Sequence, residues 1–338
     1  MFYFYKSLFL FTLILGTMIS ISSYSWMGMW LGLEINLLSI IPLISSTENP
    51  MASEAALKYF ITQAMASTVI LFSIIMLSLN IMYNIDMNFY FTILLNSALF
   101  TKMGAAPFHF WFPEIIEGLN WNNAFIMLTW QKVAPMILIM YSNLTIFYTS
   151  IIIIISSLIS GIMGINQTSL RKILAYSSIN HIGWMLSSMM LIETIWIYYF
   201  IIYCLINLNI IIIFKKFNLF NLKQLFISLN NKPMIKFFFL MNFMSLGGLP
   251  PFMGFFPKWL TIQTLIQFNY YSLTFLMIIA TLITLYFYIR IVMSITILSM
   301  NELSYYSYNY NMKLNKIYLF NFIILFSFIL CTILFNFL

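Results

Sequence analysis

The sequence predicts an all-α integral membrane protein with about eleven transmembrane helices, and two observations indicate this class. Of the 338 residues, 62% are hydrophobic and only 7% are charged, whereas a soluble domain carries about 25% charged residues. The apolar runs are long and continuous, which is typical of helices rather than of the short alternating strands of a membrane barrel. A chain of this composition cannot cover a water-facing surface, so we expect it to lie in a lipid bilayer.

The predicted spans follow one another along the chain with short connections. A helix needs about 20 apolar residues to cross the hydrocarbon core. In order, the spans are 6–24, 25–45, 55–79, 88–112, 122–142, 146–165, 172–190, 194–214, 236–267, 272–298 and 316–336. Pro135 predicts a kink in the fifth span, because proline has no N–H to donate inside a helix.

The fourth and ninth spans contain the same interruption. The segments GAAPFHFWFP at 104–113 and GLPPFMGFFP at 248–257 share the pattern G-x-x-P-F-x-x-x-F-P. Gly and Pro are poor residues for a helix interior, and broken backbone at membrane depth must be buried in protein or line a wet cavity. The match predicts two discontinuous helices.

These interruptions also predict an internal repeat. If the fourth and ninth spans correspond, the chain divides into two units of five spans, and an odd number of spans gives the second unit inverted topology. We therefore predict a first repeat at 1–143, a second inverted repeat at 144–298, and a loop with the final helix at 299–338. Chance is the alternative, but the two segments occupy corresponding spans, which favours the repeat.

Basic residues outside the spans are predicted to lie on one side of the membrane. Eleven spans place the N-terminal side next to Lys6, Arg171, Lys172, Lys215, Lys216, Lys223, Lys232, Lys236, Lys313 and Lys316. The other side receives Asp86 and Glu193. The positive-inside rule then predicts that the N-terminus faces the cytoplasm or the mitochondrial matrix. The net charge of +7 is therefore a topology signal, and it argues against a nucleic-acid partner.

Several ionisable side chains fall inside the spans. They are Glu34, Lys58, Lys102, Lys132, His181 and Lys258. A charged group at mid-depth costs at least about 2.5 kcal/mol, so such residues are functional candidates by default. Lys58 lies near the start of its span and could extend to the membrane surface, and His181 could be a packing histidine. The other four are too deep to reach the surface.

A series of buried lysines and a glutamate predicts proton-transfer chemistry. A low dielectric favours the neutral form of lysine, whereas a nearby carboxylate favours the charged form. When such a pair separates, the lysine releases its proton, and when the pair closes, the lysine takes up a proton again. Several such groups bridged by water form a relay. The sequence contains no P-loop, no GxGxxG and no cysteine cluster, so we expect the chain to be one part of a larger machine.

Six segments carry a resemblance to a known family. They are WMGMWLGLEINLLSIIPLI, SEAALKYFITQAMAS, KMGAAPFHFWFPE, WQKVAPM, LRKILAYSSINHIGWM and LGGLPPFMGFFPKW. In order and along nearly the whole chain, they resemble the NADH dehydrogenase subunit 2 family, the mitochondrially encoded antiporter-like membrane subunits of respiratory complex I. The resemblance implies an antiporter-like fold in its short eleven-helix animal form. It also implies a core membrane-arm subunit of a proton-pumping NADH:ubiquinone oxidoreductase that has no independent catalytic activity.

The resemblance further implies roles for individual residues. Glu34 matches the family's glutamate on the second helix, Lys102 its partner on the broken helix, and Lys132 the central lysine. Lys258 matches the lysine of the second broken helix, whereas Lys58 and His181 match positions with less defined roles.

The location, cofactors and partners follow from the same resemblance. The implied location is the mitochondrial inner membrane, with the N-terminus in the matrix and the C-terminus in the intermembrane space. The implied partners are neighbouring membrane-arm subunits, including antiporter-like ones, and membrane lipids. The resemblance implies no cofactor in this chain, because NADH, FMN, iron–sulfur clusters and ubiquinone belong to other subunits.

Two alternatives remain open at the level of sequence. A stand-alone cation/proton antiporter of related fold would carry a similar charged axis and would exchange ions without NADH or quinone. A purely structural subunit would use its buried charges only to hold a membrane assembly together.

Overall fold

The computed structural model describes residues 4–46, 49–83, 87–142, 144–230, 233–250, 252–297 and 321–322. In this part of the chain the regular structure is α-helical, apart from one isolated bridge between Ser169 and Asn221. The chain divides into two compact units, Met1–Ser156 and Ser157–Leu338. The predicted repeat boundary at 143/144 lies shortly before the division between these units in the sequence, which falls at 156/157. The repeats themselves stay a prediction.

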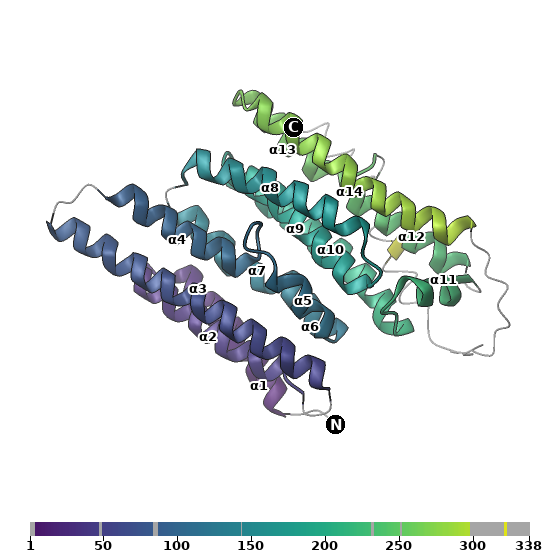
Figure 1. Cartoon of the computed structure of the whole chain (residues 1–338), viewed down its shortest axis with the longest axis horizontal. Helices are drawn as coiled ribbons and strands as arrows, with labels where there is room; N and C mark the ends of the chain where they lie inside the picture. Colours follow the sequence, from purple (N-terminus) through teal and green to yellow (C-terminus); the bar gives the residue numbers. More distant parts are fainter. Residues whose placement is uncertain are drawn as a thin grey trace. The chain divides into compact units, whose positions relative to one another are not determined.

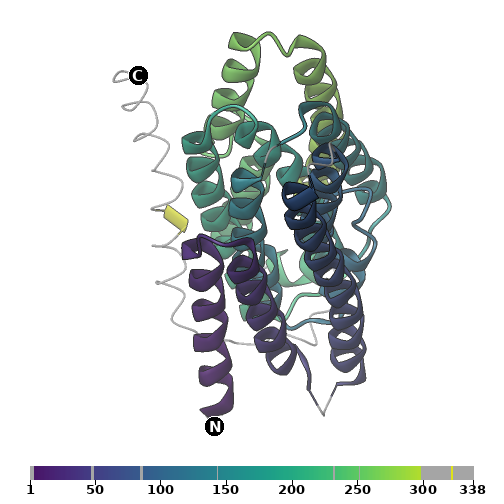
Figure 2. The ribbon, with the colours of Figure 1, turned by 90° about the vertical axis from the view of Figure 1, so that its left-hand side faces the viewer.

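The described part of the first unit contains seven complete helices (Figure 1). They are α1 (Phe4–Ser22), α2 (Trp26–Ile44), α3 (Pro50–Tyr83), α4 (Asn88–Met103), α5 (Trp111–Gly118), α6 (Trp121–Leu128) and α7 (Trp130–Tyr141). Helices α1 and α2 pack side by side, as Figure 2 shows in purple. A Cβ on Gly32 would lie 2.5 Å from the backbone nitrogen of Ser20, so a glycine is what lets these two backbones approach so closely.

The second unit is built around α9. Its helices are the end of α8 (Ile146–Ile165), then α9 (Leu170–Met189), α10 (Glu193–Phe217), α11 (Leu222–Asn230), α12 (Pro233–Gly247), α13 (Phe255–Gln267) and α14 (Tyr271–Ile297). Nearly every residue of α9 is buried, and α10, α13 and α14 all pack against it. This burial explains why α9 tolerates several serines, an asparagine and a histidine in a membrane protein.

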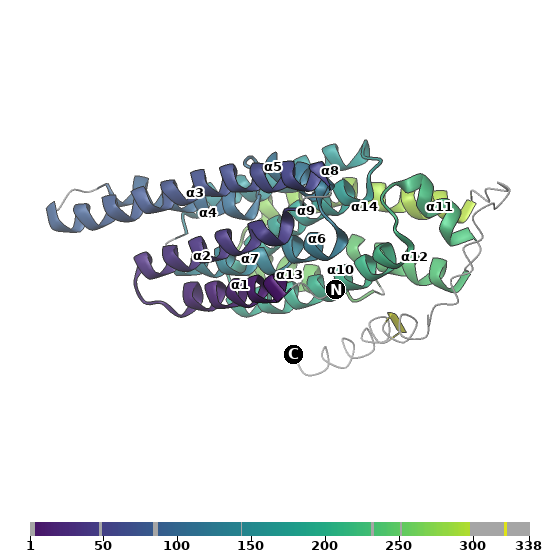
Figure 3. The ribbon, with the colours of Figure 1, turned by 90° about the horizontal axis from the view of Figure 1, so that it is seen from below.

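The described helices follow the predicted spans with two differences, an additional helix in a predicted loop and a break in the fifth span. Seven segments of the described chain are long and apolar enough to cross a membrane, and α9 and the interrupted helices fall outside that set, so the count of eleven is not confirmed. Helix α11, which lies beside α12 (Figure 3), occupies a segment predicted as a loop. Except for residues 321–322, the predicted span at 316–336 lies outside the described residues.

The second difference is that the fifth span consists of two helices. Helix α6 ends at Leu128 and α7 begins at Trp130, with Thr129 between them at φ −118° and ψ −73°. Pro135, where the kink was expected, lies inside α7. A proline disturbs the turn before it, because it cannot bond to the carbonyl four residues earlier and its ring displaces that carbonyl. The break therefore falls on the N-terminal side of Pro135.

Both predicted discontinuous helices are present, and they break at matching positions of the repeated segment. Helix α4 ends at Met103 and α12 ends at Gly247. The next residue in each case, Gly104 or Gly248, adopts the left-handed conformation with φ of 75° or 77°. This conformation strains residues that have a Cβ, which explains the glycine at the first position of both segments. The second half-helices, α5 and α13, both begin at the eighth position of the segment.

Candidate functional site

A small polar cavity lies among α2, α3, α4 and α7 in the first unit. It is lined by Leu33, Asn36, Leu37, Tyr59, Gln63, Lys102, Gln131 and Pro135, and we call it the polar cavity. Its volume of about 10 Å³ is near the minimum that one water molecule requires. Five of its eight lining residues carry a polar or charged group and are buried, which is unusual inside a membrane protein and points to a role in handling water or protons.

Lys102 is the one charged residue in this lining. It lies in the last turn of α4, two residues before the left-handed Gly104, and is 7% exposed. A cation is favourable there, because the carbonyl groups at a helix C-terminus carry partial negative charge. Among the described residues, its ammonium group makes no hydrogen bond and no ion pair, so none of them is a direct partner of its charge.

Glu34 lies near this cavity but does not pair directly with Lys102. Its carboxylate is within electrostatic range of both Lys102 and Tyr59, yet no ion pair shorter than 4.0 Å joins it to Lys102. One oxygen, Oε1, is buried and receives no hydrogen bond from the described protein. The predicted glutamate–lysine pair is therefore present as two separated groups.

Lys132 is the most deeply buried of the predicted residues, with 1% of its surface exposed. Its ammonium lies 5.3 Å from the centroid of the Phe112 ring, which suits a cation–π contact. Phe112 lies in the first turn of α5, directly after the first interruption. The broken helix thus contributes both Lys102 on one side of the break and a contact for Lys132 on the other.

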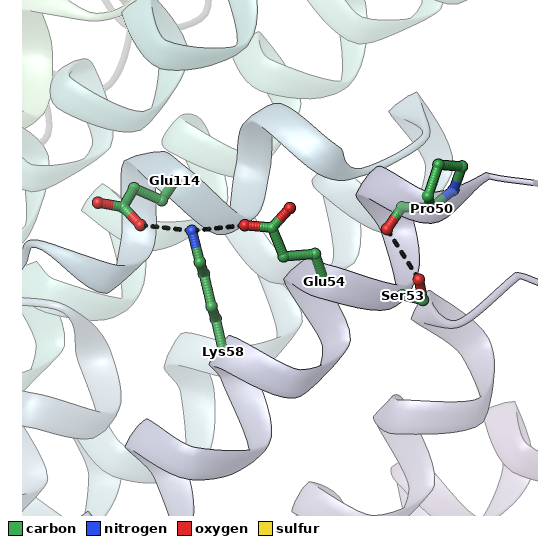
Figure 4. A network of polar contacts seen from close by, with 5 residues as sticks. All are labelled: Pro50, Ser53, Glu54, Lys58 and Glu114. Carbon is green, nitrogen blue, oxygen red and sulfur yellow. Dashed lines mark hydrogen bonds and ion pairs between the residues drawn. The ribbon is translucent and has the colours of Figure 1, made fainter.

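Lys58 differs from the other lysines because its side chain is 44% exposed. Its ammonium forms ion pairs with Glu54 at 3.0 Å, one turn earlier on α3, and with Glu114 at 2.9 Å, on α5 (Figure 4). The structure therefore places Lys58 outside the polar cavity. Its position favours a link between α3 and the second half of the broken helix.

His181 and Lys258 lie in the second unit. Nδ1 of His181 is 2.9 Å from the Tyr199 hydroxyl, and its ring lies 5.0 Å from that of Tyr203. Lys258, on α13, donates hydrogen bonds from Nζ to the carbonyl oxygens of Gly247 at 2.9 Å and Leu246 at 3.4 Å. Lys258 therefore caps the carbonyl end of α12 across the second interruption.

The cap predicts that alanine at position 248 is poorly tolerated. A Cβ there would lie 2.7 Å from Cδ and 2.9 Å from Nζ of Lys258, and the left-handed backbone adds about 1–2 kcal/mol of strain. We expect Gly248→Ala to lower the melting temperature and the yield of the assembled protein. Gly247→Ala is the matched control, because a Cβ there meets nothing closer than 3.6 Å. Equal losses in both variants would contradict this prediction.

The cavity contains polar residues that sequence reasoning missed, namely Asn36, Tyr59, Gln63 and Gln131. A signal was present in the sequence. Tyr59 and Gln63 are four residues apart and so share a helix face, and each of the four is a buried polar side chain within an apolar span. Amides and phenols are common enough in such spans that this signal is weak without knowledge of their neighbours.

Comparison with known proteins identifies the family. Residues 23–284 match the transmembrane family of NADH:quinone oxidoreductase and Mrp antiporter. The NADH-ubiquinone oxidoreductase chain 2 of Anopheles gambiae is 49% identical over 94% of both chains, and that of Locusta migratoria is 46% identical over 92% of this chain and 90% of that one. A chain of the respiratory complex I of Thermus thermophilus has the same fold, with a TM-score of 0.84 at 21% identity, covering 98% of this chain and 79% of that one. The chain therefore belongs to the NADH-ubiquinone oxidoreductase chain 2 family, within the larger family of antiporter-like membrane proteins.

Proposed function

We propose that this chain is a core membrane-arm subunit of the proton-pumping NADH:ubiquinone oxidoreductase, respiratory complex I. Its proposed relay comprises Glu34, Lys102, Lys132, His181 and Lys258, with Lys58 at an exposed position. The observation that carries this proposal is Lys102, a buried ammonium group that has no hydrogen-bond or ion-pair partner among the described residues and lines a polar cavity next to a helix break. A charge in such a place lowers the stability of the folded protein, so its presence there favours a function.

The chemistry is the gain and loss of a proton by each lysine. Low dielectric surroundings favour the neutral amine, and a carboxylate within electrostatic range favours the ammonium, so small changes in the surrounding charges decide which form is present. Glu34 supplies such a charge to Lys102. A proton released at one lysine changes the field at the next, which passes the change along the chain.

An external driver is required, because moving one charge against 100 mV costs about 2.3 kcal/mol. We propose that NADH oxidation elsewhere in the complex is this driver. NADH, FMN, iron–sulfur clusters and ubiquinone then belong to other subunits, and this chain has no independent catalytic activity. The sequence supports this assignment, since it contains no nucleotide-binding or cysteine-cluster motif.

The proposed location is the mitochondrial inner membrane, with the N-terminus in the matrix and the C-terminus in the intermembrane space. The distribution of loop lysines and arginines supports this orientation. Partners are the neighbouring membrane-arm subunits, including other antiporter-like ones, and the surrounding lipids. An epitope at the N-terminus should become accessible to antibody only after the inner membrane is opened.

A stand-alone cation/proton antiporter is the second candidate, because the matched family also includes Mrp antiporters. The two functions differ in what drives ion movement. Proton movement that continues in vesicles without NADH and quinone would favour the antiporter, whereas strict dependence on NADH oxidation would favour the complex I subunit.

Replacing Lys132 tests the proposed function against a purely structural one. We expect Lys132→Met to leave the complex assembled and to lower proton pumping by about 100-fold or more, the contribution typical of a positioned proton-transfer group. Lys132→Arg should also fail to pump, because arginine keeps its proton. Pumped protons per NADH oxidised, in vesicles, and assembly on native gels are the measurements. Normal pumping in an assembled Lys132→Met complex would refute the relay, and loss of assembly with pumping retained in the remainder would favour a structural role.

A further inference from the structure

Tyr59 is held in a fixed position within the polar cavity. It is 3% exposed, and its hydroxyl donates a hydrogen bond to Oε1 of Gln131 at 3.4 Å. Its ring packs edge-on against Trp111, with 6.1 Å between the ring centroids. Trp111 in turn donates from its indole nitrogen to the carbonyl of Thr101, at 3.1 Å, in the last turn of α4. These contacts fix the phenol relative to the broken helix that carries Lys102.

Gln131 orients this hydroxyl, and none of the three amides of the cavity transports protons. Nε2 of Gln131 donates to Oδ1 of Asn36 at 2.8 Å, and Nε2 of Gln63 donates to the carbonyl of Lys102 at 3.5 Å. An amide donates and accepts hydrogen bonds without taking up a proton near neutral pH. In the cavity lining, only Lys102 and Tyr59 carry an exchangeable proton on a group that can both release and regain it.

The polar cavity also suits one water molecule. A buried water requires about 10–15 Å³ and two to four polar partners. The cavity has a volume of about 10 Å³, and its lining offers a phenol, three amides and an ammonium group that makes no contact with a described hydrogen-bond acceptor. A water there would give the Lys102 ammonium an acceptor.

Tyr59 further connects this cavity with Glu34. The phenol lines the cavity together with Lys102 and lies within electrostatic range of the Glu34 carboxylate. That carboxylate has a buried oxygen, Oε1, to which no described group donates. Tyr59 thus shares the cavity with the Lys102 ammonium, which has no described acceptor, and lies within electrostatic range of a carboxylate oxygen that has no described donor.

We propose that the polar cavity binds one ordered water, and that this water and the Tyr59 hydroxyl carry the proton between Lys102 and Glu34. The ammonium gives a proton to the water, the water passes one of its own protons to the phenol oxygen, and the phenol proton moves to the carboxylate. Lys102 and Glu34 end neutral, and the water and Tyr59 end with the proton numbers they began with. In the structure the hydroxyl points to Gln131, so transfer requires it to turn toward Glu34.

Two measurements on the assembled complex test this proposal, which rests on the proposed function. Tyr59→Phe keeps the ring and its packing on Trp111 but removes the hydroxyl. We expect its pumping rate to fall at least about tenfold with assembly unchanged, in line with the loss of one proton-transfer group. Tyr141→Phe is the matched control, because Tyr141 is an exposed tyrosine outside the cavity and should pump normally.

The outcomes distinguish a failure of the Tyr59 path from a failure of the proposed proton-pumping function. Normal pumping by Tyr59→Phe, together with failure of Lys102→Met, would overturn the Tyr59 path and leave the function standing. Normal pumping by both variants would overturn the function itself. If Tyr59→Phe does not assemble, a high-resolution map of the unaltered complex decides. Density for a water within hydrogen-bond distance of Nζ of Lys102 and the Tyr59 oxygen supports the path, and a dry cavity overturns it.

Discussion

Replacing Lys102 by methionine is expected to abolish most proton translocation while leaving assembly and thermal stability unchanged or slightly raised. The ammonium of Lys102 makes no hydrogen bond or ion pair with described residues, so its removal breaks no polar contact in the part of the chain that the structure describes. Methionine has a similar length and no charge, and removing a buried charge that lacks a direct partner is neutral or favourable for folding. The loss of a positioned proton-transfer group lowers the rate by about 100- to 10,000-fold.

The informative measurement is therefore the combination of pumping and stability in one variant. Pumped protons per NADH oxidised should fall, while the melting temperature of the complex should not. Lys102→Arg should keep the charge and still fail to pump, because arginine does not release its proton. Lys223→Met, at an exposed position on α11, controls for the loss of one positive charge. A clear drop in melting temperature in Lys102→Met would show that the ammonium has a structural contact after all.

The two helix breaks were predictable from sequence because Gly and Pro destabilise a helix interior and occur together in both apolar segments. The repeated segments place Gly104 and Gly248 at the residues where the helices end, and both adopt the left-handed conformation. Helix α11 was missed because its segment is short and its lysines indicated a loop between two spans. Leu225 and Leu229, four residues apart and fully buried, were the helical signal in that segment.

The candidate site was predictable only in part, for a physical reason. An ionisable residue in an apolar span stands out by itself, so Glu34, Lys102, Lys132 and Lys258 could be selected one at a time. The amide and phenol groups of the cavity gain meaning only from their neighbours. Asn36 and Gln131 are far apart in sequence and meet because α2 and α7 both contribute to the cavity. Sequence likewise could not decide whether Lys58 faces inward, since that depends on which face of α3 is covered.

Replacing Lys258 should have a different effect from replacing Lys102, because Lys258 has both a charge and a structural contact. Lys258→Met removes the hydrogen bonds to the carbonyls of Gly247 and Leu246 at the end of α12. Each buried acceptor left without a donor costs about 1–3 kcal/mol. We therefore expect this variant to lose stability and yield of the assembled complex as well as pumping.

Lys258→Arg separates these two roles. A guanidinium can still donate to the carbonyls that end α12, so assembly should recover toward that of the unaltered complex. Pumping should stay low, because the charge is now permanent. An arginine variant that both assembles and pumps would show that Lys258 is a cap alone.

The contrast between the lysines follows from their positions at the two interruptions. Lys102 precedes its break and lines a cavity, whereas Lys258 follows its break and bonds to the carbonyls of the preceding half-helix. A neutral amine makes a weaker hydrogen bond to a carbonyl than an ammonium does. Loss of the proton from Lys258 should therefore weaken its bonds to the carbonyls that end α12, whereas the ammonium of Lys102 has no such bond to a described residue. We therefore expect the charge of Lys258, and not that of Lys102, to affect how firmly the two half-helices at its interruption are held together.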